Sequence, residues 1–527
     1  MPPEFALRIR IAYVKQVIVV SHFSRNNQCS ASQNSRPIDI QPKTGNREAE
    51  PYRELTVPAV AEDNGARPDE AQPSLSPVSG SLQVLAQPVR IPIGFDKSPD
   101  EILQLAARQY REHQDAARVL VPAKLALLRD YDAPGMDRAA TICHWGRSGS
   151  VLLASYFDGH EDIITLPNQT SEYAYPFCGE YQSLSLWEKL VAYPAYSQVR
   201  KGNAGDFFLK PNPDGDFAID PAHYFASVQA LFAIYGDNPE LDLGARRRFF
   251  QFLHVAYAGA LDRPPVNPRP LMISAQHWIN NELAQDFIDD FPGARFLHTI
   301  RDPISAFDSW LERHFTWQFR DNPDLAAGYR YPAFDSFRDL FSWDAGHGGL
   351  HARTRAIRFE DMHLEPEQTM RRLAEWLGVP YRPCMLDSTL NGRPYVVEAG
   401  GRRWVGPNPD NARRRSKNLN ALDQLMVFAV LHRNFAEWNY PYPRFLRHRS
   451  TRAVLVLTGM LIPTKMEWVN IKNVIRLQAA AALRKRRFAT ALFAPCALVL
   501  RRLRMIQLLT STAAARSLGK TRPMRVI

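Results

Sequence analysis

The chain has 527 residues, of which 45% are hydrophobic and 23% charged, so it is long enough for a large core and more than one domain. Its five cysteines are scattered and form no CxxC pair, which argues against a disulfide framework or a structural zinc site and favours a reducing, cytoplasmic compartment. No uninterrupted apolar run reaches the ~18 residues that a membrane span needs. Charge is uneven, because residues 444–527 hold 18 Lys and Arg against one acidic residue, Glu467.

The N-terminal part divides into two segments. Residues 1–95 are rich in Pro, Ser, Gln and Asn and show no persistent period, which predicts a disordered arm. Residues 96–134 are predicted to form a helical lead-in, because Ser98-Pro99-Asp100-Glu101 has the composition of a helix start and apolar residues follow it.

A glycine-containing turn follows the first predicted strand, 139–143, and leads into a helix over 148–157. Backbone N–H groups at a helix start lack internal acceptors and, with the helix dipole, attract anions. The turn adds one charge and two hydroxyls, from Arg147, Ser148 and Ser150. The pattern predicts a P-loop-like phosphate or sulfate site, but not a Walker A loop, because no Gly-Lys-Ser/Thr follows.

Further strands are predicted at 163–167, 271–274, 294–300 and 354–359, separated by helical segments. Strands that alternate with helices indicate an α/β fold, here a three-layer sandwich with a central parallel sheet. Helices are also predicted over 367–377, ending at Gly378, and over about 421–438.

Four stretches, in order, resemble the sulfotransferases that use 3′-phosphoadenylyl sulfate (PAPS), of the bacterial or carbohydrate type. The resemblance covers roughly 135–443, which is the predicted catalytic domain. The stretches are Gly146–Ser150; Phe291–Pro303 with Ser309; Ile357–Asp361 continuing through Trp376–Pro380; and Gly400–Trp404 with Trp438–Pro441.

The resemblance implies two anion-binding places for PAPS and no metal. The 5′ end would be bound by Arg147, Ser148, Gly149, Ser150 and Val151, and the 3′-phosphate by Arg301 and Ser309, with an added contact from Arg402 or Arg403. Arg147 would stabilise the charge that develops on the leaving phosphate. The general base would be His277, with His160, Glu161 and Glu172 as alternatives. Leu152 stands where many members carry an adenine-stacking Trp.

The expected reaction is sulfuryl transfer to a hydroxyl of an acceptor, with a carbohydrate or glycolipid preferred by resemblance to bacterial-type members. Two alternatives stay open. One is a nucleotide-dependent phosphotransferase, and the other is a catalytically inactive, membrane-tethered nucleotide-binding module.

Residues 444–527 form a basic C-terminal tail in which apolar runs alternate with basic clusters such as Arg484–Arg487. This mixture favours amphipathic helices on an anionic, cytoplasmic membrane face over a disordered basic arm or a nucleic-acid patch. Because the motifs precede the tail, removal of 446–527 is expected to leave catalysis largely intact.

Overall fold

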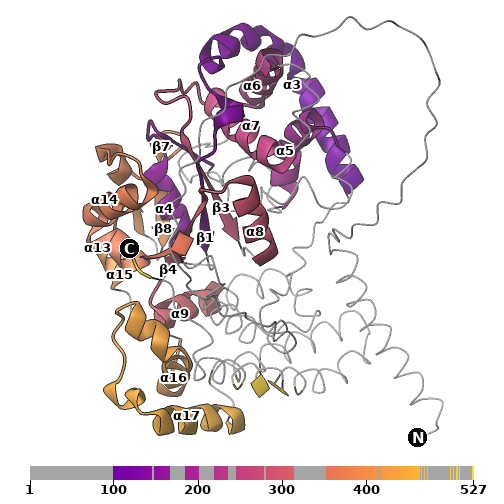
Figure 1. The fold of residues 1–527 in the computed structure, drawn as a ribbon. Coiled ribbons are helices and arrows are strands. Elements are labelled where there is room, and N and C mark those ends of the chain that lie inside the picture. Colours follow the sequence, from indigo (N-terminus) through magenta and orange to yellow (C-terminus); the bar gives the residue numbers. More distant parts are fainter. Residues whose placement is uncertain are drawn as a thin grey trace, which may run out of the picture. The chain divides into compact units, whose positions relative to one another are not determined.

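Five parallel strands form the central sheet, in the order β2-β3-β1-β4-β5 (Figure 1). They are β1 (Ala139–His144), β2 (Ile163–Thr165), β3 (Leu271–His277), β4 (Arg295–Ile300) and β5 (Thr354–Arg358). The structure is a computed structural model, and it describes 99–144, 148–166, 184–200, 219–235, 245–277, 281–313, 352–399, 402–413, 416, 418–462, a few later tail positions and 525–527. The predicted α/β class with a parallel sheet is confirmed, and the predicted N-terminal arm lies outside the described residues.

Helices cover both faces of the sheet, so the predicted three-layer arrangement is also confirmed. Along β1, Ala139 and Cys143 point into one core cluster, and Ala140 and Ile142 point into the other, because alternate strand residues face opposite sides. The first cluster is completed by α3 (Pro99–Leu128), α5 (Leu186–Arg200), α6 (Pro221–Tyr235), α7 (Ala245–Ala260) and α8 (Asn281–Asp290). The second is completed by α4 (Ser150–Phe157), α13 (Phe359–Leu364) and α14 (Pro366–Leu377).

Several predicted boundaries shift by a few residues. The helix start at Pro99 is confirmed, but α3 continues as one 30-residue helix across Pro122, where the sequence suggested separate stretches. Strand β3 runs on to His277 because Ala275–His277 pair in parallel with Ile142–His144 of β1. Phe359, predicted as the end of a strand, instead begins α13.

The C-terminal part consists of short elements and two longer helices. They are α9 (Pro303–Arg313), β6 (Thr389–Leu390), β7 (Arg393–Pro394), β8 (Val396–Ala399), β9 (Arg402–Val405), α15 (Pro409–Ala412), α16 (Ala421–Glu437) and α17 (Arg449–Leu461), with 3-10 turns at Pro383–Leu386 and Arg444–Arg447. A further 3-10 turn, Ala133–Gly135, precedes β1. Helix α17 packs on α16, and Val526 near the C-terminus makes a parallel bridge to Ala356 of β5. Among the described residues, no helix has the length and apolar character needed to cross a membrane.

Candidate active site

The carboxyl ends of the five parallel strands meet at one edge of the sheet. Strand β1 is central, and the chain visits β2 and β3 on one side of it before β4 and β5 on the other. Ligands of open α/β sheets bind at the carboxyl ends where the strand order switches direction. Residues that follow β1, β4 and β5, among them Ser148, Arg301 and Phe359, therefore form the candidate site, called here the strand-end site.

The turn after β1 is fixed to β4. Ser148 is fully buried, and its Oγ lies 2.8 Å from Oγ1 of Thr299, one residue before the end of β4. Gly149 caps the start of α4 in a left-handed conformation (φ 91°, ψ 17°) and provides no side-chain acceptor for the helix. The first N–H groups of α4 thus keep the anion-attracting character that the sequence predicts.

Gly149 packs directly against Phe359. A Cβ atom at this position would lie 2.5 Å from Cδ2 of Phe359 and 3.1 Å from Cε of Met362. The close approach and the positive φ both exclude an ordinary side chain, which explains why a glycine occupies this place.

Arg301 lies on the same aromatic ring. Its side chain is only 7% exposed, and its guanidinium carbon is 4.5 Å from the ring centroid of Phe359. Burial raises the pKa of neighbouring Asp302, although hydrogen bonding to Ser305 and the charge of Arg301 act in the opposite direction. The Asp302 carboxylate accepts from the Ser305 N–H at 2.8 Å and so caps α9, while Asp308 accepts from Ser416 and Asn418. The structure thus brings a buried cation next to the turn after β1.

Glu360 joins three elements around Arg301. Its Oε1 accepts from the Asp302 N–H at 3.0 Å, and its Oε2 accepts from the Tyr440 hydroxyl at 2.6 Å. Burial raises the pKa of Glu360, although these two hydrogen bonds favour its ionised form. The guanidinium carbon of Arg358 lies over the ring of Tyr440, 4.7 Å from the ring centroid. The ends of β4 and β5 are therefore held together with the segment that follows α16.

The hairpin of β8 and β9, which carries the exposed residues Arg402 and Arg403, leads into a segment anchored to α13. The Asn408 N–H donates to Nδ1 of His363 at 2.8 Å. His363 is 3% exposed, and burial, together with the charge of Arg301, lowers its pKa from 6.5 to about 4. A neutral His363 that accepts at Nδ1 carries its proton on Nε2. This histidine links the end of the hairpin to the helix that Phe359 begins.

Most of the predicted donor-binding residues have a described position. Ser150 is buried in the first turn of α4, Val151 packs against Leu390, and Ser309 is half-buried in α9. Arg147 lies outside the described residues. Leu152, at the place of the adenine-stacking Trp, is buried in the core that α4 shares with α13 and α14.

The structure places the described candidates for the general base at two opposite edges of the sheet. His277 ends β3, and its Cα pairs with that of His144 at the end of β1, so its backbone lies at the strand-end site. His160 and Glu161 precede β2 and therefore lie at the opposite edge, where His160 is within 2.9 Å of the Pro380 carbonyl and Glu161 pairs with Arg382. The structure does not bring these two alternatives to the strand-end site, and Glu172 lies outside the described residues.

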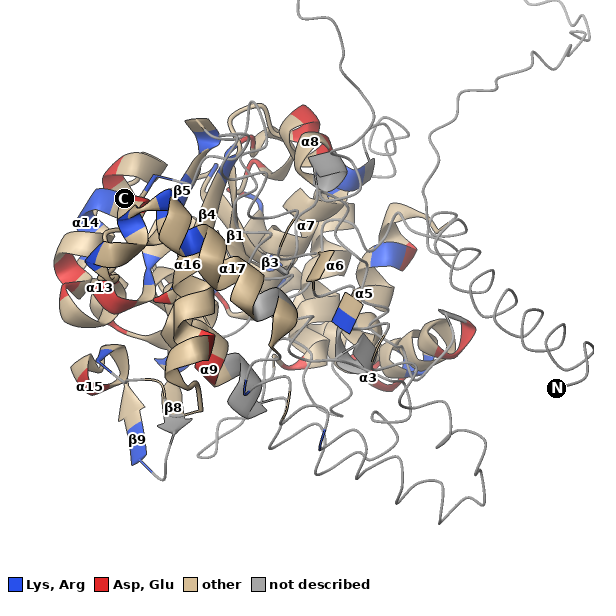
Figure 2. Cartoon of the chain, turned by 90° about the horizontal axis from the view of Figure 1, so that it is seen from below, with Lys and Arg blue, Asp and Glu red and all other residues tan. Residues whose placement is uncertain are grey.

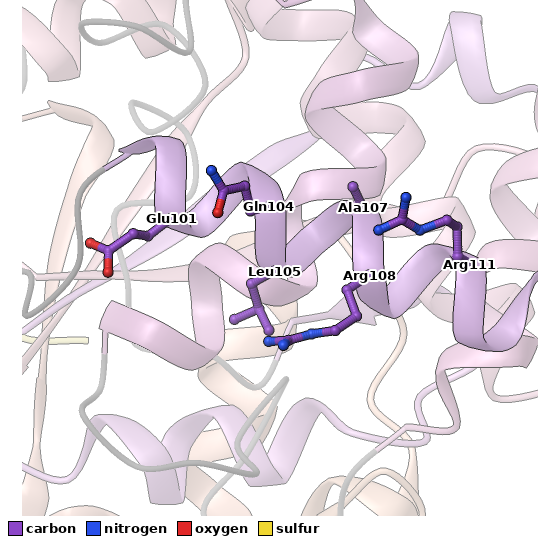
Figure 3. Close-up of a pocket in the computed structure, with 6 residues that line it drawn as sticks. All are labelled: Glu101, Gln104, Leu105, Ala107, Arg108 and Arg111. Carbon is purple, nitrogen blue, oxygen red and sulfur yellow. The ribbon is translucent and has the colours of Figure 1, made fainter.

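Four residues of this arrangement were not assigned a role from the sequence: Thr299, Phe359, Glu360 and His363. Phe359 and Glu360 stand inside a stretch that resembles the sulfotransferases, so a signal was present. Thr299 and His363 also lie within such stretches, but no local pattern marks their roles, because their partners come from strands and turns far away in the sequence. A pocket elsewhere is lined by residues of α3 alone (Figure 3), and none of these residues belongs to the strand-end site.

Residues 142–383 match the profile of the sulfotransferase family. Among curated proteins no match was found. Similar solved structures include the sulfotransferase domain of the curacin biosynthetic pathway (15% identity, TM-score 0.30, covering 58% of this chain and 99% of that one). A second is the sulfotransferase domain of the Synechococcus PCC 7002 olefin synthase (16% identity, TM-score 0.26, covering 49% of this chain and 80% of that one). A third is sulfotransferase STF9 of Mycobacterium avium (16% identity, TM-score 0.28, covering 55% of this chain and 87% of that one).

The assignment rests on the family match and on the order of the motifs, which span both the turn after β1 and the strand end that carries Arg301. Through residues 142–383, the chain is similar to the sulfotransferase family.

Proposed function

We propose that the protein transfers the sulfuryl group of PAPS to a hydroxyl of an acceptor, preferably a carbohydrate or a glycolipid. One observation carries the choice of donor. The anion-attracting start of α4 and the buried Arg301 lie at adjacent strand ends and share the ring of Phe359. A donor with anionic groups at both ends of its sugar needs two such places, and these residues fit it.

The donor-binding roles divide between the two places. The turn at Ser148 and Gly149 with the first N–H groups of α4 would bind the 5′ end, and Arg301 with Ser309 the 3′-phosphate. Arg402 or Arg403 would add a contact from the β8–β9 hairpin. The proposed reaction uses no metal ion.

Arg147 and His277 supply the proposed chemistry. Arg147, next to Ser148 in the sequence, would stabilise the negative charge on the leaving oxygen more in the transition state than in the ground state. Because arginine stays protonated, it would act through its charge and not as an acid. His277 would take the proton of the acceptor hydroxyl. His277 ends β3, which flanks β1 on the side away from β4. The acceptor hydroxyl would therefore be bound on one side of β1, and the 3′-phosphate of the donor on the other side, near Arg301.

The competing proposal of a phosphotransferase has less support. Ser150 follows Gly149, where a Walker A loop would have its lysine. Strand β4 leads into Arg301, where a phosphotransferase would be expected to have an aspartate that binds Mg²⁺. Titration calorimetry with PAPS, its desulfated product and ATP with Mg²⁺ separates the two functions. We expect binding of PAPS and its product, whereas tight binding of ATP with Mg²⁺ and none of the product would overturn the proposal. An inactive module would bind nucleotide but transfer no labelled sulfate to any component of a cell extract.

Arg301→Ala tests the proposed 3′-phosphate contact. Loss of a charge-assisted hydrogen bond should weaken binding of the product nucleotide by ~1.5–3 kcal/mol. Arg295→Ala is a matched control, because Arg295 begins the same strand and also lies over an aromatic ring, that of Trp376 at 5.3 Å, but at the opposite edge of the sheet. Arg147→Ala should reduce turnover far more than affinity. Equal behaviour of Arg147→Ala and Arg301→Ala would contradict this division of roles.

A further inference from the structure

Helix α17 presents an apolar face to solvent. Val454, Leu457 and Leu461 are 59%, 55% and 82% exposed, and their spacing of three and four residues places them on one side of the helix. Val456 lies on the opposite side and is 8% exposed, in line with the packing of α17 on α16. This face continues at the C-terminal end of the helix with Ile462, which is 51% exposed.

The same region carries positive charge only. Arg444, Arg447 and Arg449 are exposed at the start of α17, and the sequence contains no acidic residue between Glu437 and Glu467. Arg452 is held differently, because its guanidinium donates to the carbonyl oxygens of Leu446 and Arg447 at 2.6 and 2.8 Å. Figure 2 shows α17 next to α16, and no acidic residue is coloured on the ribbon of α17, in agreement with its sequence.

We propose that α17 lies in the headgroup region of an anionic membrane, with Val454, Leu457 and Leu461 inserted among the lipids. A lipid surface satisfies both features, since it accepts apolar side chains and attracts arginines. Pairing with a second copy would cover the apolar face but would leave the arginines without an anionic partner, because the region has no acidic residue between Glu437 and Glu467. A nucleic acid would attract the arginines but would leave the apolar face exposed.

The site and the membrane helix are connected through the fold. Helix α16, on which α17 packs, is followed by Tyr440, whose hydroxyl donates to Glu360 at the strand-end site. A membrane-bound α17 would bring the enzyme to acceptors in the same membrane, which favours the glycolipid class. Only this last step rests on the proposed function.

Co-sedimentation of the full-length chain with phosphatidylcholine vesicles, with and without one-fifth phosphatidylglycerol, tests the membrane contact. We expect binding to the anionic vesicles that falls partly with salt, because exposed charges are screened and apolar insertion is not. The double variant Leu457→Gln, Leu461→Gln should lose the salt-resistant part and partition at least ~10-fold more weakly, since each inserted leucine contributes apolar burial. Val119→Gln with Val266→Gln is the control, because these valines, 80% and 64% exposed, are large apolar side chains exposed elsewhere on the molecule.

The leucine variant should keep the thermal unfolding midpoint of the wild type, because both side chains are exposed. Wild-type protein that ignores anionic vesicles at low salt would overturn the proposal, as would a leucine variant that binds like the wild type. So would a leucine variant that changes a dimer into a monomer in sedimentation velocity without changing vesicle binding, since the face would then be a contact between copies. Nucleotide binding measured on the same samples tells failure of this inference apart from failure of the proposed function.

Discussion

Gly149 meets two steric demands at once, a left-handed backbone and a close approach to the Phe359 ring. Gly149→Ala should lower the free energy of unfolding by more than the ~1–2 kcal/mol that the left-handed conformation costs an ordinary residue, and it should weaken nucleotide binding. Gly159→Ala is the control, because Gly159 also has a positive φ (81°) but nothing lies within 4 Å of an added Cβ. Urea unfolding of both variants measures the difference. Equal destabilisation would show that the Phe359 contact adds no constraint.

His363 should make the stability of the protein depend on pH. Its pKa falls from 6.5 to about 4 on folding, so the unfolded chain binds more protons between these values. Its contribution to stability is therefore complete above about 6.5 and is lost progressively as the pH falls toward 4. Protonation of Nδ1 would also turn the acceptor of the Asn408 N–H into a second donor.

His363→Asn and His363→Phe separate these effects. Asn keeps a side-chain oxygen that can accept from Asn408 and does not titrate, whereas Phe keeps a ring without an acceptor. The difference in unfolding free energy between wild type and His363→Asn should shrink from pH 7 to pH 5, and only His363→Phe should weaken nucleotide binding at pH 7. The comparison at each pH removes the contributions of Asp302, Glu360 and Asp361, whose pKa values burial raises. A difference that stays constant with pH would contradict the role of His363.

Single residues with a special backbone or charge could be predicted from the sequence, and their partners could not. Gly149 and Arg301 stand in recognisable patterns after strands. The hydrogen bond between the hydroxyls of Ser148 and Thr299 depends on β4 lying next to β1, and the sequence order places two other strands between them. Proximity of Arg301, Phe359 and His363 likewise follows from strand order, which no local pattern specifies.

At the scale of elements, the last three residues complete the edge of the sheet. The Ala356 N–H donates to the Arg525 carbonyl at 2.8 Å, and the Ile527 N–H donates to the Ala356 carbonyl at 3.0 Å. Ile527 also packs against the core that contains Ile357. The basic tail is therefore attached to the body of the protein at its far end, which its composition did not indicate.

Deletion of 525–527 should lower the free energy of unfolding by ~1–3 kcal/mol from the two lost hydrogen bonds. It should also promote concentration-dependent association, because an unpaired strand edge is a template for other chains. Ile527→Ala is the partner variant, since it keeps both hydrogen bonds and removes most of the apolar contact. Urea unfolding and light scattering measure the two effects. A deletion no more destabilising than Ile527→Ala would mean that the pairing contributes nothing.

Element boundaries were predictable where a local signal sets them. Gly378 ends α14 in a left-handed conformation, as predicted, and α16 begins after Asn420, which forms a capping box with Asp423. Tertiary contacts set the others. Pairing with β1 extends β3, and packing against α5 and α6 accompanies the continuation of α3 across Pro122.

At the scale of the whole molecule, alternation of strands and helices was sufficient for the α/β class, and the ordered motifs were sufficient for the family. The place where the catalytic body ends was harder to predict, because the charge changes near Arg444 but the packing does not. Leu446 is fully buried, Val456 is 8% exposed, and α17 contacts α16. Part of the basic tail thus belongs to the same packed unit as the strand-end site.

Two truncations test this conclusion. Removal of 463–527 keeps α17 and should preserve nucleotide binding and turnover on a soluble acceptor. Removal of 446–527 also deletes buried Leu446 and the contact of α17 with α16. Because the loss of one buried leucine side chain costs ~2–5 kcal/mol, this shorter chain should unfold at markedly lower urea concentration and lose activity with its structure. If both truncated chains unfolded at the same urea concentration and turned over equally, α17 would be an appendage, and the catalytic domain would end near residue 443 as the sequence predicts.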